Sequence, residues 1–196
     1  MRLGWLALLG AAGLLHAQNS DLALLAGISG PHGEVVQSPT SVISGSVGAS
    51  GQINYAWQVV QRAVDLYVEL PLVLTGENSG VVRPAMVSST TGLDVFFTPG
   101  VRVKFSPQSR VSFYAAVGGG VASLGSSESV VEPGLVTEVN KRTTSAALDF
   151  GGGIDFRLTR LLSLRVDGRD FVTGRDPSGA SGRNRWMVLV GVAFHF

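Results

Sequence analysis

The chain has 196 residues, with 26 glycines, no cysteine and 15 basic residues against 14 acidic ones. The lack of cysteine excludes a disulfide scaffold, a Cys-ligated metal site and a thiol enzyme, and the near-neutral charge argues against a nucleic-acid binder. Only 15% of the residues are charged and the mean hydropathy is +0.30, so the composition also argues against disorder.

Residues 1–17 have the pattern of a cleaved signal peptide. Arg2 supplies a short positive region, residues 3–15 are almost entirely apolar, and Leu15-His16-Ala17 ends in a small residue. The apolar stretch is too short to cross about 30 Å of hydrocarbon as a helix. We therefore expect a signal peptide at 1–17 and a mature exported domain at 18–196, whose charges balance at 14 to 14.

Beyond residue 18 the apolar residues alternate with a period of two, which predicts strands. In residues 63–74, for example, Leu66, Val68 and Leu70 share one face while Asp65 and Glu69 share the other. The phase of the first segment is ambiguous. Eight such segments cover 22–30, 46–59, 63–74, 93–105, 111–121, 146–156, 162–169 and 186–196.

The predicted connections alternate in length. Short ones fall at 60–62, 106–109 and 157–161, and longer ones rich in Gly, Ser, Thr and Pro cover 31–43, 76–91, 123–142 and 172–185. An even number of strands, with short turns at one rim and long loops at the other, is typical of outer-membrane barrels. The sequence therefore predicts an all-β fold, an eight-stranded antiparallel up-and-down transmembrane β-barrel.

Alternation alone also fits a soluble lipocalin-like barrel that carries an apolar ligand. Three features favour lipid outside the barrel: the apolar faces carry few charges, the opposite faces mix small residues with scattered charges, and the chain ends with Phe194 and Phe196 in phase. A lipocalin-like carrier would instead need its apolar faces to point inward.

The polar faces place acids and bases inside the barrel. An eight-stranded barrel is just wide enough for side chains to fill it, and unpaired buried charges cost several kcal/mol each. We expect these residues to form a salt-bridge network that fills the lumen; the alternative is a small porin or an ion- or proton-conducting path along them. The residues are Asp65, Glu69, Asp94, Arg102, Lys104, Asp149, Asp155, Arg165, Asp167 and Arg169.

The signal peptide, the eight strands and the terminal VLVGVAFHF together resemble the small outer-membrane β-barrel family that includes OmpA- and OmpX-type barrels. The resemblance spans 18–196, and residues 151–171 look like the penultimate hairpin of such barrels. It implies a monomer in the lipid bilayer of the bacterial outer membrane. It also implies that the last strand, with Trp186, Phe194 and Phe196, is the signal read by the outer-membrane assembly machinery.

Catalytic and cofactor signals are weak. The mature chain offers His32 in a loop and His195 at the periplasmic rim, and no helix follows the glycine runs at 118–120 and 151–153. Metal-ligand spacing is absent. We expect no enzymatic activity, no cofactor, no metal and no nucleic acid, but a structural role or an interaction through loops such as 124–141, whose partner the sequence does not identify.

Two irregularities carry their own predictions. Pro71 and Pro99 fall within neighbouring strands, nearly opposite each other, and proline cannot donate to a ladder; we expect a loosened or bulged seam there. Asp170 has the phase of the apolar face of 162–169. Either Asp170 lies beyond the hydrocarbon or a bulge near Gly168 resets the phase.

Overall fold

A computed structural model describes residues 20–31, 37–38, 41–45, 47–83, 86–132, 135–174 and 184–196. The predicted signal peptide and its cleavage site lie outside these residues, as does His32. Within the described ranges, no helix has the length and apolar character needed to cross a membrane.

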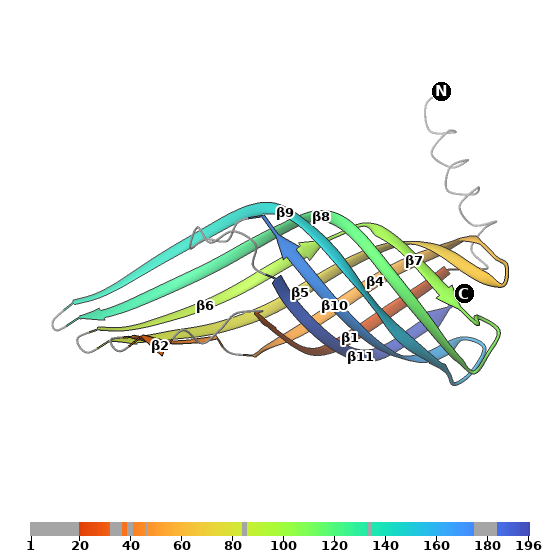
Figure 1. Cartoon of the computed structure of the whole chain (residues 1–196), viewed down its shortest axis with the longest axis horizontal. Coiled ribbons are helices and arrows are strands. Elements are labelled where there is room, and N and C mark those ends of the chain that lie inside the picture. Colours follow the sequence, from red (N-terminus) through yellow and green to blue (C-terminus); the bar gives the residue numbers. More distant parts are fainter. Residues whose placement is uncertain are drawn as a thin grey trace, which may run out of the picture.

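The structure is a closed antiparallel barrel (Figure 1). The first strand of the ring pairs with the last, and β6 and β7 together form one wall strand because both pair with β5 and β8. The predicted eight-stranded up-and-down barrel is therefore confirmed. The strands are β1 (Ser20–Pro31), β2 (Gln37–Ser38), β3 (Ser41–Gly45), β4 (Gly48–Val60), β5 (Val64–Arg83), β6 (Met86–Phe97), β7 (Gly100–Phe105), β8 (Val111–Glu132), β9 (Leu135–Arg157), β10 (Leu162–Thr173) and β11 (Asn184–His195).

Strand register fixes the tilt of the wall. A path through directly paired residues leaves β8 at Val121 and returns to it at Val111, a shift of ten residues. Such a shear requires strongly tilted strands, typically 35–45° from the barrel axis. The path runs through Phe97, Leu72, Ile53, Leu24, Val192, Leu164 and Phe156.

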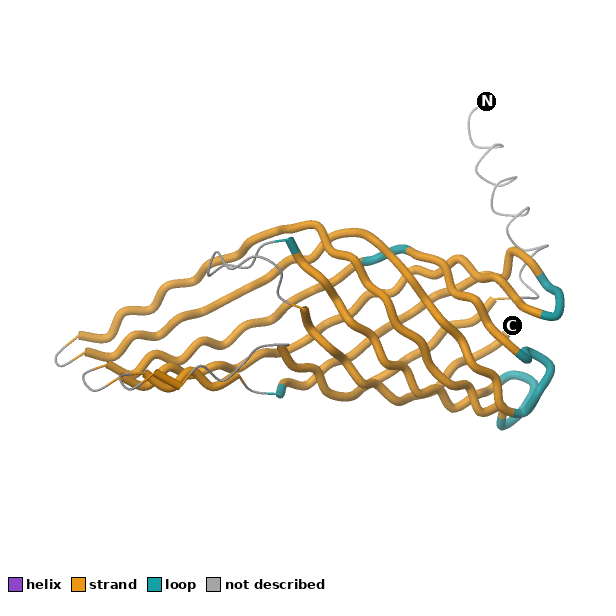
Figure 2. The backbone as a smooth tube through the Cα atoms, in the orientation of Figure 1, coloured by secondary structure: helices purple, strands orange, loops and turns teal. Residues whose placement is uncertain are grey.

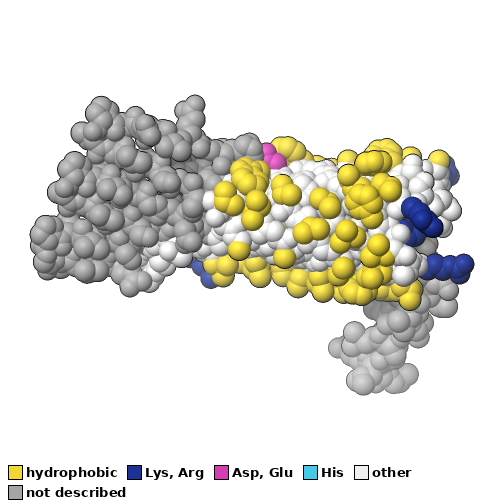
Figure 3. Space-filling view, turned by 90° about the horizontal axis from the view of Figure 1, so that it is seen from below, with side chains coloured by type: hydrophobic (Ala, Val, Ile, Leu, Met, Phe, Trp, Pro, Cys, Tyr) yellow, Lys and Arg dark blue, Asp and Glu magenta, His cyan; other side chains and the backbone are white. Residues whose placement is uncertain are grey.

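Every residue on that path faces outward with an apolar side chain, and the same alternation recurs in the rest of the wall. Leu148 is 61% exposed and Val117 is 60% exposed, whereas their neighbours Asp149 and Ala116 are buried. Hydrophobic side chains are spread over the described wall on the face shown in Figure 3, with Lys and Arg confined to its two ends. The lipocalin-like alternative is wrong, because the apolar faces point away from the interior.

The phase of the first strand, which the sequence left open, is resolved by burial. Asp21, Ala23 and Leu25 are buried, and Leu24 and Ile28 are exposed. Strand β1 therefore contributes a carboxylate to the interior that sequence analysis did not assign.

The predicted long connections at 76–91 and 123–142 are wrong, because both are largely strand. Strands β5 and β6 stay paired out to Arg83 and Met86, and β8 and β9 to Glu132 and Leu135. Their Ser, Thr and Val residues tolerate extended structure, and pairing satisfies the backbone groups beyond the wall. Figures 1 and 2 show these ribbons reaching well past the other strands.

The other two long connections are only partly described. Strand β3, within the predicted loop at 31–43 and just beyond it, pairs with β5 and widens the outer sheet. Strand β10 ends at Thr173, strand β11 begins at Asn184, and residues 175–183 lie outside the described part.

The predicted proline seam is confirmed. The ladder on β5 passes from Leu72 opposite Phe97 to Glu69 opposite Gly100, so Pro71 has no ladder partner on that side. The gap separates β6 from β7 and is visible as a loop in mid-wall (Figure 2). On its other side, Gly119 N donates to the carbonyl oxygen of Pro99 at 3.1 Å.

Asp170 lies in a regular strand. Pairing runs without a register shift through Gly168, which is opposite Gly152 on one side and Val188 on the other. The bulge alternative is therefore wrong. Asp170 keeps its outward phase near the outer end of β10, between Phe150 and Trp186.

Candidate functional site

The ten charged residues assigned to the lumen by sequence all have buried side chains. They come from four wall strands, β5, β6 with β7, β9 and β10, and the period of two aims each of them inward. Eight of the ten join one network with Asp21, and the other two make separate contacts. The eight are Glu69, Arg102, Lys104, Asp149, Asp155, Arg165, Asp167 and Arg169.

The half of the network nearer the chain termini is built on Asp155 and Asp21. Arg165 grips Asp155 with two hydrogen bonds, Nε to Oδ1 at 2.7 Å and Nη2 to Oδ2 at 2.9 Å. Lys104 Nζ lies 2.6 Å from Asp155 Oδ2. Asp21 Oδ2 then receives Arg102 Nη2 at 2.5 Å and Arg165 Nη2 at 3.2 Å, so one carboxylate joins two guanidinium groups.

The other half is built on Arg169. Its guanidinium lies 2.8 Å from Glu69 Oε1, 3.0 Å from Asp149 Oδ2 and 3.1 Å from Asp167 Oδ1. Glu69 connects the two halves, because Arg102 Nε lies 3.8 Å from Glu69 Oε2. Four cations and five carboxylates thus form a continuous network across the lumen.

Uncharged groups complete the network. Tyr114 Oη donates to Asp167 Oδ2 at 2.6 Å, Thr98 Oγ1 to Asp149 Oδ2 at 2.6 Å, and Asn54 Nδ2 to Glu69 Oε2 at 3.0 Å. The guanidinium carbon of Arg102 lies 4.8 Å from the ring centroid of Tyr67, within the range of cation–π attraction. These contacts help to offset the cost of burying the charges.

The glycine run at 151–153 makes space for this network. A Cβ atom at Gly151 would lie 2.9 Å from Cγ of Arg169, and one at Gly153 would overlap the hydroxyl of Tyr114. A Cβ atom at either position would also overlap a backbone oxygen of β10, that of Gly168 or of Val166, so these glycines permit the close approach of the neighbouring strand as well.

A second interior layer is apolar, and sequence analysis missed it. The rings of Phe96 and Phe171 lie 4.7 Å apart, and both residues are fully buried among other apolar side chains. Phe96 has the inward phase, but its outward neighbours Val95 and Phe97 are apolar too, so the alternation gave no contrast there. The cluster comprises Ala23, Leu25, Val73, Phe96, Ala122, Leu124, Ala147, Phe171, Met187, Leu189 and Ala193.

The two remaining predicted residues lie apart from the network. Asp94 forms an ion pair with Arg185, which sequence analysis missed because it directly precedes the last predicted strand. Asp65 lies near the turn between β4 and β5, where its Oδ1 accepts the backbone N–H of Arg62 at 3.2 Å.

The predicted assembly signal lies on the outer face of β11. Phe194 is 42% exposed, Phe196 is 50% exposed, and Trp186 is half-buried. The closing seam is regular: Ser20 N donates to Phe196 O at 2.8 Å and Phe196 N to Ser20 O at 3.0 Å. Tyr55, Trp57 and Phe105 are other exposed aromatic residues near the rim at which Phe194 and Phe196 lie.

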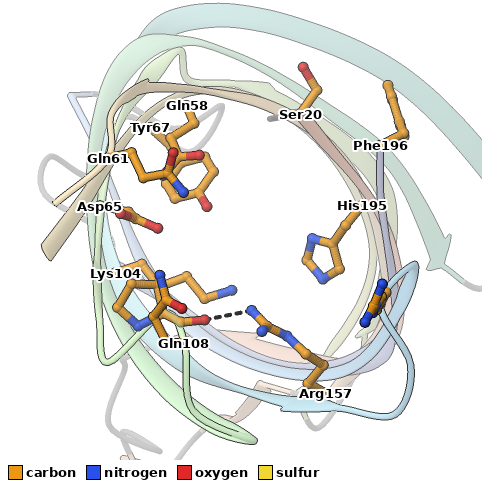
Figure 4. A pocket seen from close by; sticks show the side chains of 12 residues that line it. Ser20, Gln58, Gln61, Asp65, Tyr67, Lys104, Gln108, Arg157, His195 and Phe196 are labelled. Atoms are coloured by element: carbon orange, nitrogen blue, oxygen red, sulfur yellow. Dashed lines mark hydrogen bonds between the residues drawn. The ribbon is translucent and has the colours of Figure 1, made fainter. Parts of the chain in front are cut away.

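A polar cavity of about 280 Å³ opens at the end of the barrel that carries the short turns (Figure 4). It lies next to Lys104 and Tyr67, and the turns add Gln61, Gln108 and Arg157. His195 borders it, with Nε2 2.8 Å from the hydroxyl of Ser163. Among the described residues, no cluster of His, Cys, Asp and Glu could hold a metal ion.

Comparison with known proteins gives structural likeness only. No protein-family model matches the chain, and no curated protein does. Neisserial surface protein A has 15% identity and a TM-score of 0.50, with 90% of this chain and 97% of that one covered. The outer membrane protease OmpT from Escherichia coli has 6% identity and a TM-score of 0.57, with coverage of 92% and 97%. The outer membrane protein OprG from Pseudomonas aeruginosa has 10% identity and a TM-score of 0.50, with coverage of 91% and 97%.

At these identities the likeness shows the fold, which is that of small bacterial outer-membrane barrels of the OmpA and OmpX type. The resemblance stated from the sequence is confirmed at that level. Together with the exposed apolar wall, the fold makes this chain an outer-membrane β-barrel protein, with the lipid bilayer of the bacterial outer membrane as its surroundings.

Proposed function

We propose that the protein is a closed barrel with a side-chain-filled lumen, whose role is structural or an interaction through its outer ribbons. The observation that carries this proposal is the presence of two different interior layers, the charge network around Arg169 and the apolar cluster around Phe96 and Phe171. An ion would have to separate buried ion pairs and also enter an apolar layer, and both steps are costly.

The outer ribbons are the proposed interaction surface. Strands β5, β6, β8 and β9 continue past the ends of β10 and β11, and they form a broad sheet with β3 (Figure 1). A sheet outside the bilayer offers backbone groups at its edges to an extended partner segment. This surface includes the region 124–141 chosen from the sequence.

We further propose that the barrel is not an enzyme, that it is a monomer, and that the assembly machinery reads the strand containing Trp186, Phe194 and Phe196. The Ser163–His195 contact has the residue types of a nucleophile and its base. However, no carboxylate among the described residues hydrogen-bonds to His195, so the third member of a triad is missing there. The likeness to the outer membrane protease OmpT extends to the fold alone.

Conductance in planar bilayers tests the closed lumen. The refolded protein, first checked for heat-modifiable migration on a gel, should give no unitary current. The double variant Arg165→Met, Arg169→Met should likewise give no unitary current. Stepwise current in the wild type that falls in the double variant would support the small-porin alternative instead.

A further inference from the structure

The cavity at the end of the barrel with the short turns is suited to binding a small ligand. Three turns and the ends of β1 and β11 surround it, and it is lined by side chains of both charges. We propose that it binds an amino-acid-like zwitterion from the periplasmic side, with the carboxylate at Arg157 and Arg160 and the ammonium group at Asp65.

The cavity is closed at its inner end. Its inner boundary includes Lys104, which is held 2.6 Å from Asp155, and Asp155 is in turn gripped by Arg165. A molecule that enters at this mouth therefore meets the charge network, so the site captures a ligand without passing it on. This step rests on the proposed closed lumen, which conductance tests separately from binding.

One wall supplies uncompensated positive charge. Arg157 Nη2 donates to the carbonyl oxygen of Pro107 at 2.5 Å, which holds its guanidinium over the mouth (Figure 4). That partner is neutral, and no described carboxylate forms an ion pair with Arg157 or with Arg160 from the same turn. Arginine binds carboxylates through paired, charge-assisted hydrogen bonds.

The opposite wall supplies a negative charge. Asp65 lies across the mouth from Arg157 (Figure 4) and is only 4% exposed. It accepts the backbone N–H of Arg62, but no described Lys or Arg side chain forms an ion pair with it. An ammonium group would supply the missing counter-charge, whereas a phosphate dianion would be repelled by Asp65.

Amide groups lie between the two charged walls. Gln58, Gln61 and Gln108 all line the cavity, and the buried Nε2 of Gln58 has no partner among the described residues. These donors and acceptors suit the polar atoms of a free amino acid or of a dipeptide. Both carry one ammonium group and one carboxylate, closer together in the amino acid than in the dipeptide.

The proposal can be tested by titrating the refolded full-length barrel in detergent while following the side-chain amide NMR signals of the three glutamines. Glycine, glycylglycine, acetate, methylamine and inorganic phosphate serve as separate probes. Glycine or glycylglycine should shift these signals saturably, and more tightly than acetate or methylamine. Saturation by glycine would identify the free amino acid as a source, and saturation by glycylglycine alone would identify a dipeptide.

Variants separate the two walls. Arg157→Gln combined with Arg160→Gln should weaken zwitterion binding by about tenfold or more, because charge-assisted hydrogen bonds are lost. Asp65→Asn should abolish the preference for glycine over acetate. Arg142→Gln, an exposed change on the outer part of β9, is the matched control and should bind like the wild type.

Several results would overturn the proposal: no saturable shift with glycine or glycylglycine, phosphate binding more tightly than either, or unchanged affinity in the double arginine variant. Preserved preference for glycine in Asp65→Asn would refute the ammonium assignment. Heat-modifiable migration of each variant shows that it has folded, so a loss of binding reports on the cavity.

Discussion

The two halves of the barrel interior are filled by opposite chemistry. The half that adjoins the mouth cavity holds nine interlinked charged side chains around Arg102, Arg165 and Arg169. The other holds Phe96, Phe171 and their apolar neighbours, with the ion pair of Asp94 and Arg185 beside them. Both halves are enclosed by the same eight strands and the same apolar outer face, so the wall does not dictate what fills the lumen.

The two halves differ in how strictly they require one arrangement of their side chains. Apolar side chains gain free energy from burial in almost any arrangement that fills the space. Buried charges are stabilised only where each one meets its partner. The charge network therefore demands one register between β5, β7, β9 and β10, and the apolar cluster demands mainly volume.

Removing one cation should have the largest effect. Arg169→Met would leave Glu69, Asp149 and Asp167 without their shared partner, so we expect the free energy of unfolding to fall by about 4 kcal/mol. Urea unfolding in lipid vesicles, followed by tryptophan fluorescence, measures this loss. Arg142→Met, a control on the outer part of β9, should stay near the wild-type value; a similar loss in both variants would contradict a special role for the network.

A truncation in the apolar half should cost somewhat less. Phe171→Ala removes a buried ring that packs on Phe96, and we expect a loss of about 3 kcal/mol in the same unfolding assay. The volume argument adds a second expectation: Phe171→Leu should recover much of the loss, because the cluster tolerates a change of shape. If Phe171→Leu lowered the free energy of unfolding as much as Phe171→Ala, the apolar half would require one side-chain arrangement as strictly as the charged half does.

Filling space beside the network should have an intermediate effect. In Gly153→Ala the new methyl group would overlap the Val166 carbonyl oxygen and the hydroxyl of Tyr114, and we expect a loss of about 2 kcal/mol in unfolding free energy. Gly168→Ala is the matched control, because its Cβ would meet nothing closer than the Gly152 carbonyl oxygen at 3.8 Å. Adding Tyr114→Ala to Gly153→Ala should relieve only the overlap with the hydroxyl, because the Val166 carbonyl oxygen would still lie against the new methyl group.

The contrast between the two halves also explains how much the sequence could predict. Period-two alternation gave the eight strands, the barrel and the inward phase of residues such as Arg165 and Asp155. It could not give the pairing, because partners depend on the ten-residue shear of the closed ring. Arg102 on β7, for instance, pairs with Asp21 on β1, which is far from it in the sequence.

The misses have physical causes of the same kind. Alternation detects an inward residue only by contrast with its neighbours, so Leu189 between Val188 and Val190 carried no signal. Asp21 stands near the start of a strand whose other residues are apolar or small on both faces. Residues 76–91 looked like a loop because Gly and Ser often mark turns. The long ladders of β5–β6 and β8–β9 depend on pairing between strands, which local composition does not predict.

The smallest effect should come from an uncharged member of the network. Thr98 follows β6 at the proline seam, and its hydroxyl donates to Asp149 Oδ2 at 2.6 Å. Thr98→Val keeps the shape but removes the donor, so we expect a loss of about 1.5 kcal/mol in unfolding free energy, since Asp149 retains Arg169. In the Arg169→Met background the same change should cost more, because Thr98 would then be the remaining side-chain donor to Asp149 among the contacts described. Equal losses in both backgrounds would mean that the two donors act independently, and the network would then be a set of separate pairs.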